Sequence, residues 1–146
     1  MKLFTIGFTK TSAAHFFRRL KDAGVKRLVD VRLNRSSQLA GFAKEGDLAY
    51  FAQEICGIPT EAIPELAPEP EMLAGYREGG KDAGAWAAYA HEFRRLIAAR
   101  RIETLDRARL DGACLLCSEA LPHHCHRRIV ADYLSEKWGD VEVVDL

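Results

Sequence analysis

The hydrophobic positions of the chain alternate between short apolar runs and segments with helical spacing. Residues 3–6 form an apolar run, and residues 12–23 place three apolar side chains at the spacing of one helical face. Gly24 follows where a helix commonly ends, and residues 27–31 form the next apolar run. The start of the chain therefore predicts a strand, a helix and a second strand.

The rest of the chain continues this alternation, with one irregular stretch. The pattern predicts helices over residues 47–56, 85–99 and 122–137, and strands over residues 58–63, 113–116 and 141–144. Residues 64–84 contain three prolines, four glycines and many charged side chains. This composition favours an irregular flap with a helical piece near residues 69–77.

Strands that alternate with helices indicate a mostly parallel sheet. Parallel neighbours need crossover connections, which are usually right-handed, so helices are expected on both faces of the sheet. The 146 residues are enough for one hydrophobic core. We therefore predict a single α/β domain over residues 1–146, with the three layers of a Rossmann-like fold and with the flap inside it.

Polar side chains follow three of the predicted strands. They are Lys10 after the first strand, Asp30 and Arg32 after the second, Cys117 and Glu119 after the third, and Cys125, His126 and Arg127 near the start of the next helix. Ligands of such sheets bind outside the carboxyl ends of the strands. We therefore expect these side chains to meet at one edge and to form the functional site.

Charge and cysteine content limit the class of protein. The 21 basic residues balance 21 acidic ones, so no overall field would hold the protein on a nucleic-acid backbone or an anionic membrane. No run approaches the roughly 20 apolar residues of a membrane span, and the first residues do not resemble a secretion signal. Four cysteines in a chain with an ordinary core are expected to be thiols or ligands. We expect a soluble, cytoplasmic protein.

Cys125 is expected in the first turn of a helix, because Pro122 suits the first helical position. Backbone N–H groups lack helical partners there, and with Arg127 or a protonated His126 they would make a thiol more acidic. Cys125 is thus a candidate thiolate. The alternative is that Cys125 is a small buried hydrophobic residue.

Cys117 lies where the chain leaves a predicted strand, and Glu119 follows two residues later. Both side chains project to the same side if the backbone stays extended, as a nucleophile or ligand beside a base would. The alternative is a core cysteine next to a solvated carboxylate. Cys114 should face the opposite side of the sheet and belong to the core.

The spacing of the cysteines resembles a zinc ligand set, but the strand geometry opposes it. Residues three apart in a strand lie about 10 Å apart on opposite faces, whereas zinc–sulfur bonds are about 2.3 Å long. We therefore predict no metal on Cys114 and Cys117 together. A site that uses Cys117 and Cys125 with His123, His124 or His126 remains an alternative. No phosphate-binding glycine motif is found.

The predicted edge carries more basic than acidic groups. Five basic side chains, Lys10, Arg32, Arg35, Arg127 and Arg128, oppose the two acidic side chains Asp30 and Glu119. This balance favours an anionic ligand, with Arg32, Arg127, Lys10 and Asp30 as its binding residues. The alternative is that Asp30 and Arg32 belong to an internal network of ion pairs.

Over nearly its whole length the chain resembles DUF488, a bacterial and archaeal family of unknown function. The matching motifs are T-I-G at residues 5–7, D-V-R at 30–32, L-C-x-E at 116–119 and C-H-R at 125–127. The last two are the most specific. Arg35 replaces a usual proline, and a common Gly-Gly is missing after Leu66. The resemblance implies one α/β domain with a shared site, but no activity.

These observations favour an enzyme that acts on an anionic substrate, such as a phosphate-bearing molecule, a nucleotide or a nucleic acid. Cys117 or Cys125 would be the thiolate, Glu119 or His126 the acid or base, and Arg32 and Arg127 the anion clamp. The alternatives are a thiol redox protein that uses Cys117 and Cys125, and a non-catalytic module that binds nucleic acid or metal. The sequence specifies no cofactor, reaction or oligomeric state.

Overall fold

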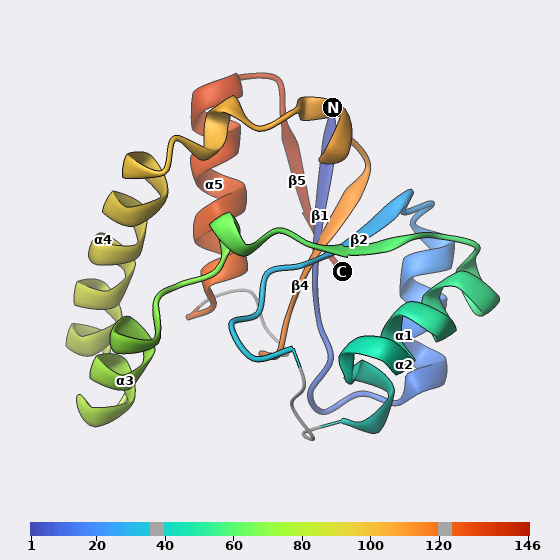
Figure 1. Cartoon of the computed structure of the whole chain (residues 1–146), viewed down its shortest axis with the longest axis horizontal. Helices are drawn as coiled ribbons and strands as arrows, with labels where there is room; N and C mark the ends of the chain where they lie inside the picture. Colours follow the sequence, from blue (N-terminus) through green and yellow to red (C-terminus); the bar gives the residue numbers. More distant parts are fainter. Residues whose placement is uncertain (36–39, 120–123) are drawn as a thin grey trace.

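The computed structural model describes residues 1–35, 40–119 and 124–146. These residues form a sheet of five parallel strands in the order β3-β2-β4-β1-β5 (Figure 1). The strands are β1 (Lys2–Gly7), β2 (Arg27–Asp30), β3 (Thr60–Ala62), β4 (Ala113–Cys117) and β5 (Glu142–Asp145). The predicted α/β class is confirmed.

Five α-helices accompany the strands in the described part of the chain. They are α1 (Ala13–Asp22), α2 (Glu45–Phe51), α3 (Pro70–Glu78), α4 (Ala83–Ala99) and α5 (His126–Trp138). A π-helical turn, Ala52–Cys56, extends α2, and short 3₁₀ turns occur at Gly41–Ala43, Pro64–Leu66, Ile102–Thr104 and Arg107–Arg109. None of the described helices is long and apolar enough to cross a membrane.

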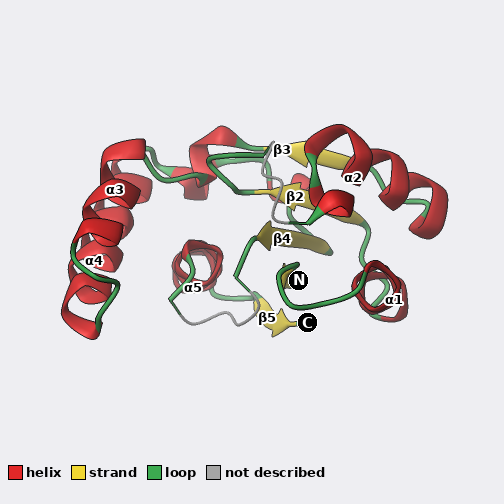
Figure 2. Ribbon diagram, turned by 90° about the horizontal axis from the view of Figure 1, so that it is seen from below, coloured by secondary structure: helices red, strands yellow, loops and turns green. Residues whose placement is uncertain are grey.

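The sheet separates two hydrophobic cores, because side chains alternate along each strand. In β4, Leu115 and Cys117 face one core, whereas Cys114 and Leu116 face the other. Helices α4 and α5 cover the first face and helices α1 and α2 cover the second (Figure 2). The predicted three layers are confirmed, and Cys114 lies opposite Cys117 as expected.

Helix α1 shows how local sequence sets the packing. The Ser12 side chain caps the helix by accepting a hydrogen bond from the His15 N–H at 3.1 Å. Phe16, Phe17 and Leu20 then share the face that is buried against the sheet. His15 stays exposed on the opposite side.

The helical piece predicted near residues 69–77 is α3. Tyr76 of α3 packs on Trp86 and Tyr89 of α4, with ring centroids 5.7 and 5.3 Å apart. These contacts hold α3 against α4, and both helices lie on the same side of the sheet as α5 (Figure 2). The segment between β3 and β4 thus contributes a pair of packed helices to one side of the molecule.

The helix predicted from Pro122 begins later, at His126, and Pro122 itself lies outside the described residues. His124 has a left-handed φ of 59°, and Cys125 has an extended backbone with φ of −135° and ψ of 136°. Neither conformation continues a helix. Cys125 is therefore the N-cap residue of α5 and not a residue of its first turn.

The strand order places a topological switch beside β4. The chain leaves β2 toward α2 on one face of the sheet, and it leaves β4 toward α5 on the other face. Because β2 and β4 are neighbours, the connections that follow them diverge and open a crevice at the carboxyl ends of the two strands, where sheets of this kind bind ligands.

Candidate functional site

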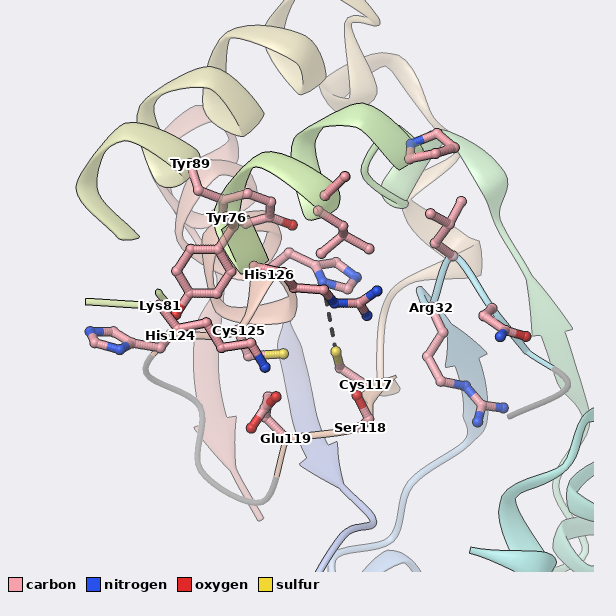
Figure 3. A pocket seen from close by; sticks show the side chains of 16 residues that line it. Arg32, Tyr76, Lys81, Tyr89, Cys117, Ser118, Glu119, His124, Cys125 and His126 are labelled. Atoms are coloured by element: carbon pink, nitrogen blue, oxygen red, sulfur yellow. Dashed lines mark hydrogen bonds between the residues drawn. The ribbon is translucent and has the colours of Figure 1, made fainter. Parts of the chain in front are cut away.

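A cavity of about 320 Å³ lies at the carboxyl ends of β2 and β4 (Figure 3). The structure brings five of the predicted site residues to its wall: Arg32, Cys117, Glu119, Cys125 and His126. The other three, Lys10, Asp30 and Arg127, are not part of the lining. The cavity therefore contains the predicted thiols and imidazole but only one of the predicted cations.

Hydrogen bonds from the loop after β1 fix the end of β4. Cys117 pairs with Gly7 in the sheet, and the next carbonyl, that of Ser118, accepts hydrogen bonds from Thr9. The Thr9 N–H lies 3.1 Å and the Thr9 hydroxyl 2.8 Å from this oxygen. The backbone that carries Cys117 is thus held by β1 and by the loop that follows it.

His126 lies between Cys117 and the end of β2. Its Nδ1 is 3.7 Å from the Cys117 Sγ, and its Nε2 is 2.5 Å from the Val31 carbonyl oxygen (Figure 3). A carbonyl only accepts hydrogen bonds, so Nε2 carries the hydrogen and Nδ1 of the neutral ring turns its lone pair to the thiol. The Phe93 ring packs edge-on at 5.6 Å. His126 is oriented to take the proton of Cys117.

The two cavity thiols have different acidities. The hydrogen bond from Cys125 lowers the pKa of Cys117, and this effect together with the Arg127 charge and the Ser118 and Glu119 N–H groups outweighs the opposing effect of burial. Burial and the Cys117 thiol raise the pKa of Cys125 well above its usual value. The prediction of an acidic Cys125 is not supported, because its side chain is buried at the N-cap of α5 beside the Cys117 thiol.

Arg127 supports the site from behind the cavity wall. Its side chain is buried, and one Nη donates to the Glu119 carbonyl oxygen at 2.6 Å. Its charge helps to lower the pKa of Cys117 and opposes the effect of burial on Cys114. Arg127 therefore positions the loop after β4 and contributes a field, which differs from the anion clamp that the sequence indicated.

Arg32 and Asp30 form a buried ion pair. The Arg32 Nε and Nη2 donate to the two Asp30 carboxylate oxygens at 2.9 and 2.7 Å, and Nη2 also donates to the Ala43 carbonyl at 2.7 Å. The guanidinium lies 5.0 Å from the centre of the Phe8 ring and points away from Cys117 (Figure 3). This arrangement matches the internal ion pair that the sequence left as an alternative to a clamp.

The remaining predicted cations also lie elsewhere. Lys10 is exposed and does not line the cavity. Arg35 pairs with Glu45 at 3.2 Å, and Arg128 pairs with Asp132 at 2.9 Å. Of the five basic groups predicted at the cavity, Arg32 is the one that belongs to its described lining.

The opposite wall of the cavity comes from helices that the sequence analysis did not assign to the site. It includes Leu73, Tyr76 and Arg77 of α3, Lys81 in the turn that follows, and Tyr89 of α4. Arg77, Lys81 and Glu119 are exposed, and we call these three residues the rim. Aromatic residues at helical spacing are typical of a hydrophobic core, so the sequence pattern does not mark Tyr76 and Tyr89 as site residues. They become part of the cavity wall because α3 folds over the edge of the sheet.

Tyr89 presents a buried hydroxyl to this space. Within the described residues the hydroxyl has no hydrogen-bond partner, although the side chain is only 4% exposed. Burial raises the pKa of Tyr89, and negative charge on Cys117 or Cys125 raises it further. The phenol is therefore protonated at neutral pH and can donate a hydrogen bond.

The same cluster has the composition of a metal site. One ligand atom each from Cys117, Cys125 and His126 lies within 4.8 Å of the others, and all three side chains are buried. Cys114 faces the opposite core, so the strand geometry excludes it from this set. His124 stacks on Trp86 with ring centroids 4.9 Å apart, and His123 lies outside the described residues.

Fold and site together define a three-layer α/β protein with a cysteine–histidine pair at the carboxyl edge of a parallel sheet. The chain belongs to the family described as domain of unknown function DUF488, whose model matches residues 12–134. The match covers α1 through most of α5 and confirms the family that the sequence resembles. No curated protein and no solved structure shows significant similarity to the chain.

Proposed function

We propose that this protein is an enzyme in which the Cys117 thiolate attacks an anionic substrate at the carboxyl edge of the sheet. The observation that carries the proposal is the position of His126, with Nδ1 3.7 Å from the Cys117 Sγ and Nε2 2.5 Å from the Val31 carbonyl. A nucleophile, a base and a group that orients the base are the parts that nucleophilic catalysis requires. The adjoining cavity supplies room for a substrate.

Each side chain at the cavity wall then has a distinct role. His126 accepts the proton of Cys117, and the Val31 carbonyl keeps the imidazole in the correct tautomer. Cys125 remains a thiol, because its pKa is raised, and it stabilises the thiolate by donating a hydrogen bond. Glu119 is exposed at the rim and is less suited than His126 to act as the base.

The preference for an anion rests on the rim. Arg77 and Lys81 place two cationic side chains at the exposed part of the cavity, where Glu119 is the opposing acid. A charged substrate is attracted by such groups even when the net charge of the protein is zero. Carboxylates and phosphates, including the phosphate of a nucleotide, have the required chemistry.

Alkylation kinetics test the thiolate and the anion preference together. Wild-type protein is treated with limiting iodoacetamide, which is neutral, or iodoacetate, which is anionic, and each cysteine is followed by peptide mass spectrometry. We expect Cys117 to react before Cys56, the half-buried thiol that serves as an internal reference. We also expect Cys117 to favour iodoacetate relative to Cys56.

Matched variants show which residues cause the fast alkylation and the preference for iodoacetate. Cys117→Ala should remove the fast reaction, whereas Cys114→Ala, which changes a thiol on the other face of the sheet, should not. The double variant Arg77→Gln, Lys81→Gln should lose the preference for iodoacetate and keep the reaction with iodoacetamide. Equal reactivity of Cys117 and Cys56 in the wild type would contradict the proposal.

A zinc-binding site is the second candidate, favoured by the grouping of Cys117, Cys125 and His126. A tetrahedral zinc ion with bonds of about 2.3 Å to sulfur and about 2.0 Å to nitrogen holds these atoms about 3.5 Å apart. The Sγ–Nδ1 distance of 3.7 Å is close to this value. A hydrogen bond from the other ring nitrogen to a backbone carbonyl is also typical of histidine ligands.

Elemental analysis separates the two candidates. Protein purified without chelator and without an affinity tag that binds metal is measured for zinc, and Cys125→Ala is measured in parallel. One zinc ion per chain, lost in the variant, would establish the metal site and exclude free Cys117 as the nucleophile. Less than a tenth of an equivalent would leave the thiolate enzyme as the supported function.

A further inference from the structure

The hydroxyl of Tyr89 has no role in the chemistry described so far. It is buried at the cavity wall, and none of the described residues accepts its hydrogen or donates to its oxygen. A buried hydroxyl without a partner is unfavourable, because it has lost its water and gained no hydrogen bond. Such a group in the wall of a cavity finds its partner when a ligand enters.

Tyr89 is also held rigidly. Its ring packs between Tyr76 and Phe93, with centroids 5.3 and 6.1 Å away, and Trp86 lies 5.4 Å away. It reaches from α4 into the space that Cys117 and His126 enter from the sheet side (Figure 3). A donor fixed before the reaction stabilises developing charge without reorganising, which is the property of an oxyanion site.

We propose that the Tyr89 hydroxyl donates a hydrogen bond to the oxygen that becomes negatively charged when Cys117 attacks an acyl group. This inference rests on the proposed function and names its reaction class as acyl transfer. The substrate class is an ester, thioester or amide that also carries a carboxylate or a phosphate. This anionic group would face Arg77 and Lys81.

The step balances with the groups present. The Cys117 sulfur bonds to the carbonyl carbon, and the carbonyl π electrons move to the oxygen that faces Tyr89. Collapse of this intermediate re-forms the carbonyl and expels the leaving group, which takes the proton that His126 received from Cys117. His126 then takes a proton from water, the resulting hydroxide attacks the thioester carbonyl, and the carbon–sulfur bond breaks, which releases the carboxylic acid and returns the proton from His126 to the Cys117 sulfur.

Acyl transfer fits the cavity better than phosphoryl transfer does. A transferring phosphoryl group spreads charge over three oxygens, which requires several donors or a metal ion around them. Two buried donors of the described lining have no hydrogen-bond partner, the Tyr89 hydroxyl and the Arg32 Nη1, and of these the Arg32 guanidinium points away from Cys117 (Figure 3). One fixed donor suits the single oxyanion of an acyl intermediate.

The experiment compares acylation with alkylation of the same thiol. The probes are para-nitrophenyl acetate and the para-nitrophenyl monoester of succinate, with acyl-Cys117 followed by mass spectrometry, and iodoacetamide as the alkylating agent. Alkylation creates no oxyanion. Tyr89→Phe should therefore slow acylation about 100-fold and leave alkylation of Cys117 unchanged. The succinate ester should react faster than the acetate.

Tyr133→Phe is the matched control, because Tyr133 does not line the cavity. Its hydroxyl donates a hydrogen bond of 2.8 Å to the Glu103 carboxylate. It should change neither rate. A thermal melt checks folding, and Tyr89→Phe should melt no lower than the wild type, because it removes a hydroxyl without a partner among the described residues.

The outcomes separate this inference from the proposed function. If Tyr89→Phe slows both reactions equally or neither of them, the oxyanion role is overturned. If Cys117 is alkylated rapidly but neither ester acylates it, acyl transfer is overturned and the thiolate enzyme stands. If Cys117 reacts no faster than Cys56 with any reagent, the proposed function itself fails.

Discussion

At the scale of single residues, the ion pair between Arg32 and Asp30 shows how a candidate binding residue becomes a structural one. Both side chains are about 96% buried, and the Asp30 carboxylate also accepts the Arg32 backbone N–H at 3.1 Å. The pair ties the end of β2 to Ala43. These partners hold Nε and Nη2 of the guanidinium, whereas Nη1 has no hydrogen-bond partner among the described residues.

Removing one partner of this pair should destabilise the fold. Arg32→Ala leaves a buried carboxylate without its countercharge, and we expect a loss of about 3–5 kcal/mol in the free energy of unfolding by urea. The double variant Asp30→Asn, Arg32→Met should recover part of this loss, because no isolated charge remains. Arg35→Ala, which removes a more exposed pair with Glu45, should cost at most about 1 kcal/mol. A similarly small loss for Arg32→Ala would contradict the structural role.

The acidity of Cys117 gives a prediction for pH. Its pKa is lowered, first by the hydrogen bond from Cys125, whereas burial raises the pKa of Cys56. Only the thiolate reacts with iodoacetamide, so the rate at Cys117 should reach its plateau at a lower pH than the rate at Cys56. Cys125→Ala removes the donor and should shift the Cys117 midpoint upward. An unchanged midpoint would show that Cys125 does not support the thiolate.

At the scale of elements, the end of β4 and the start of α5 form the centre of the site. Cys117 belongs to the strand and Cys125 caps the helix, and their sulfur atoms lie within 4.8 Å of each other. Sequence reasoning placed both thiols correctly at the carboxyl edge, because strand and helix periodicity fix that edge. Sequence reasoning did not predict the left-handed conformation of His124, two residues before α5 begins. This conformation is unfavourable for a residue other than glycine, and only contacts in the folded chain outweigh its cost.

The proximity of the two sulfurs predicts a disulfide between β4 and α5 under mild oxidation. Thiolate and thiol are adjacent, so oxidised glutathione should convert Cys117 and Cys125 to an intramolecular disulfide with the loss of two hydrogens. Intact and peptide mass spectrometry, with and without dithiothreitol, measures this. Cys114 should remain reduced, because it faces the other core. A mixed disulfide with glutathione that persists at Cys117 would show that Cys125 cannot reach it.

At the scale of the whole molecule, the fold was largely readable from the sequence, whereas half of the cavity was not. Alternating strands and helices determine the parallel sheet, and the sheet determines the edge at which Cys117 and His126 meet. The other wall depends on α3 folding back over this edge, with Tyr76 packed on Tyr89. The periodicity of α3 and α4 predicts that each helix buries one face, but it does not specify which element covers that face. The contact between Tyr76 and Tyr89 therefore cannot be predicted from local pattern.

The distribution of charge over the molecule argues against a general nucleic-acid-binding surface. Outside the buried pair, seven arginines of the described chain form ion pairs with carboxylates: Arg27, Arg35, Arg94, Arg100, Arg107, Arg109 and Arg128. Their charge is locally balanced, as the equal totals of acidic and basic residues also indicate. Nonspecific binding depends on basic groups that neutralise phosphates and release counterions.

We therefore expect fluorescently labelled single- and double-stranded DNA and RNA to bind with a Kd weaker than about 10⁻⁴ M at physiological salt, by fluorescence anisotropy. Affinity tighter than about 10⁻⁶ M that falls steeply with salt would contradict this and support the nucleic-acid-binding alternative. In that case Arg77→Gln, Lys81→Gln would test whether the rim is the contact. Loss of binding in that variant would place the nucleic acid at the cavity, whereas unchanged binding would place it on another surface.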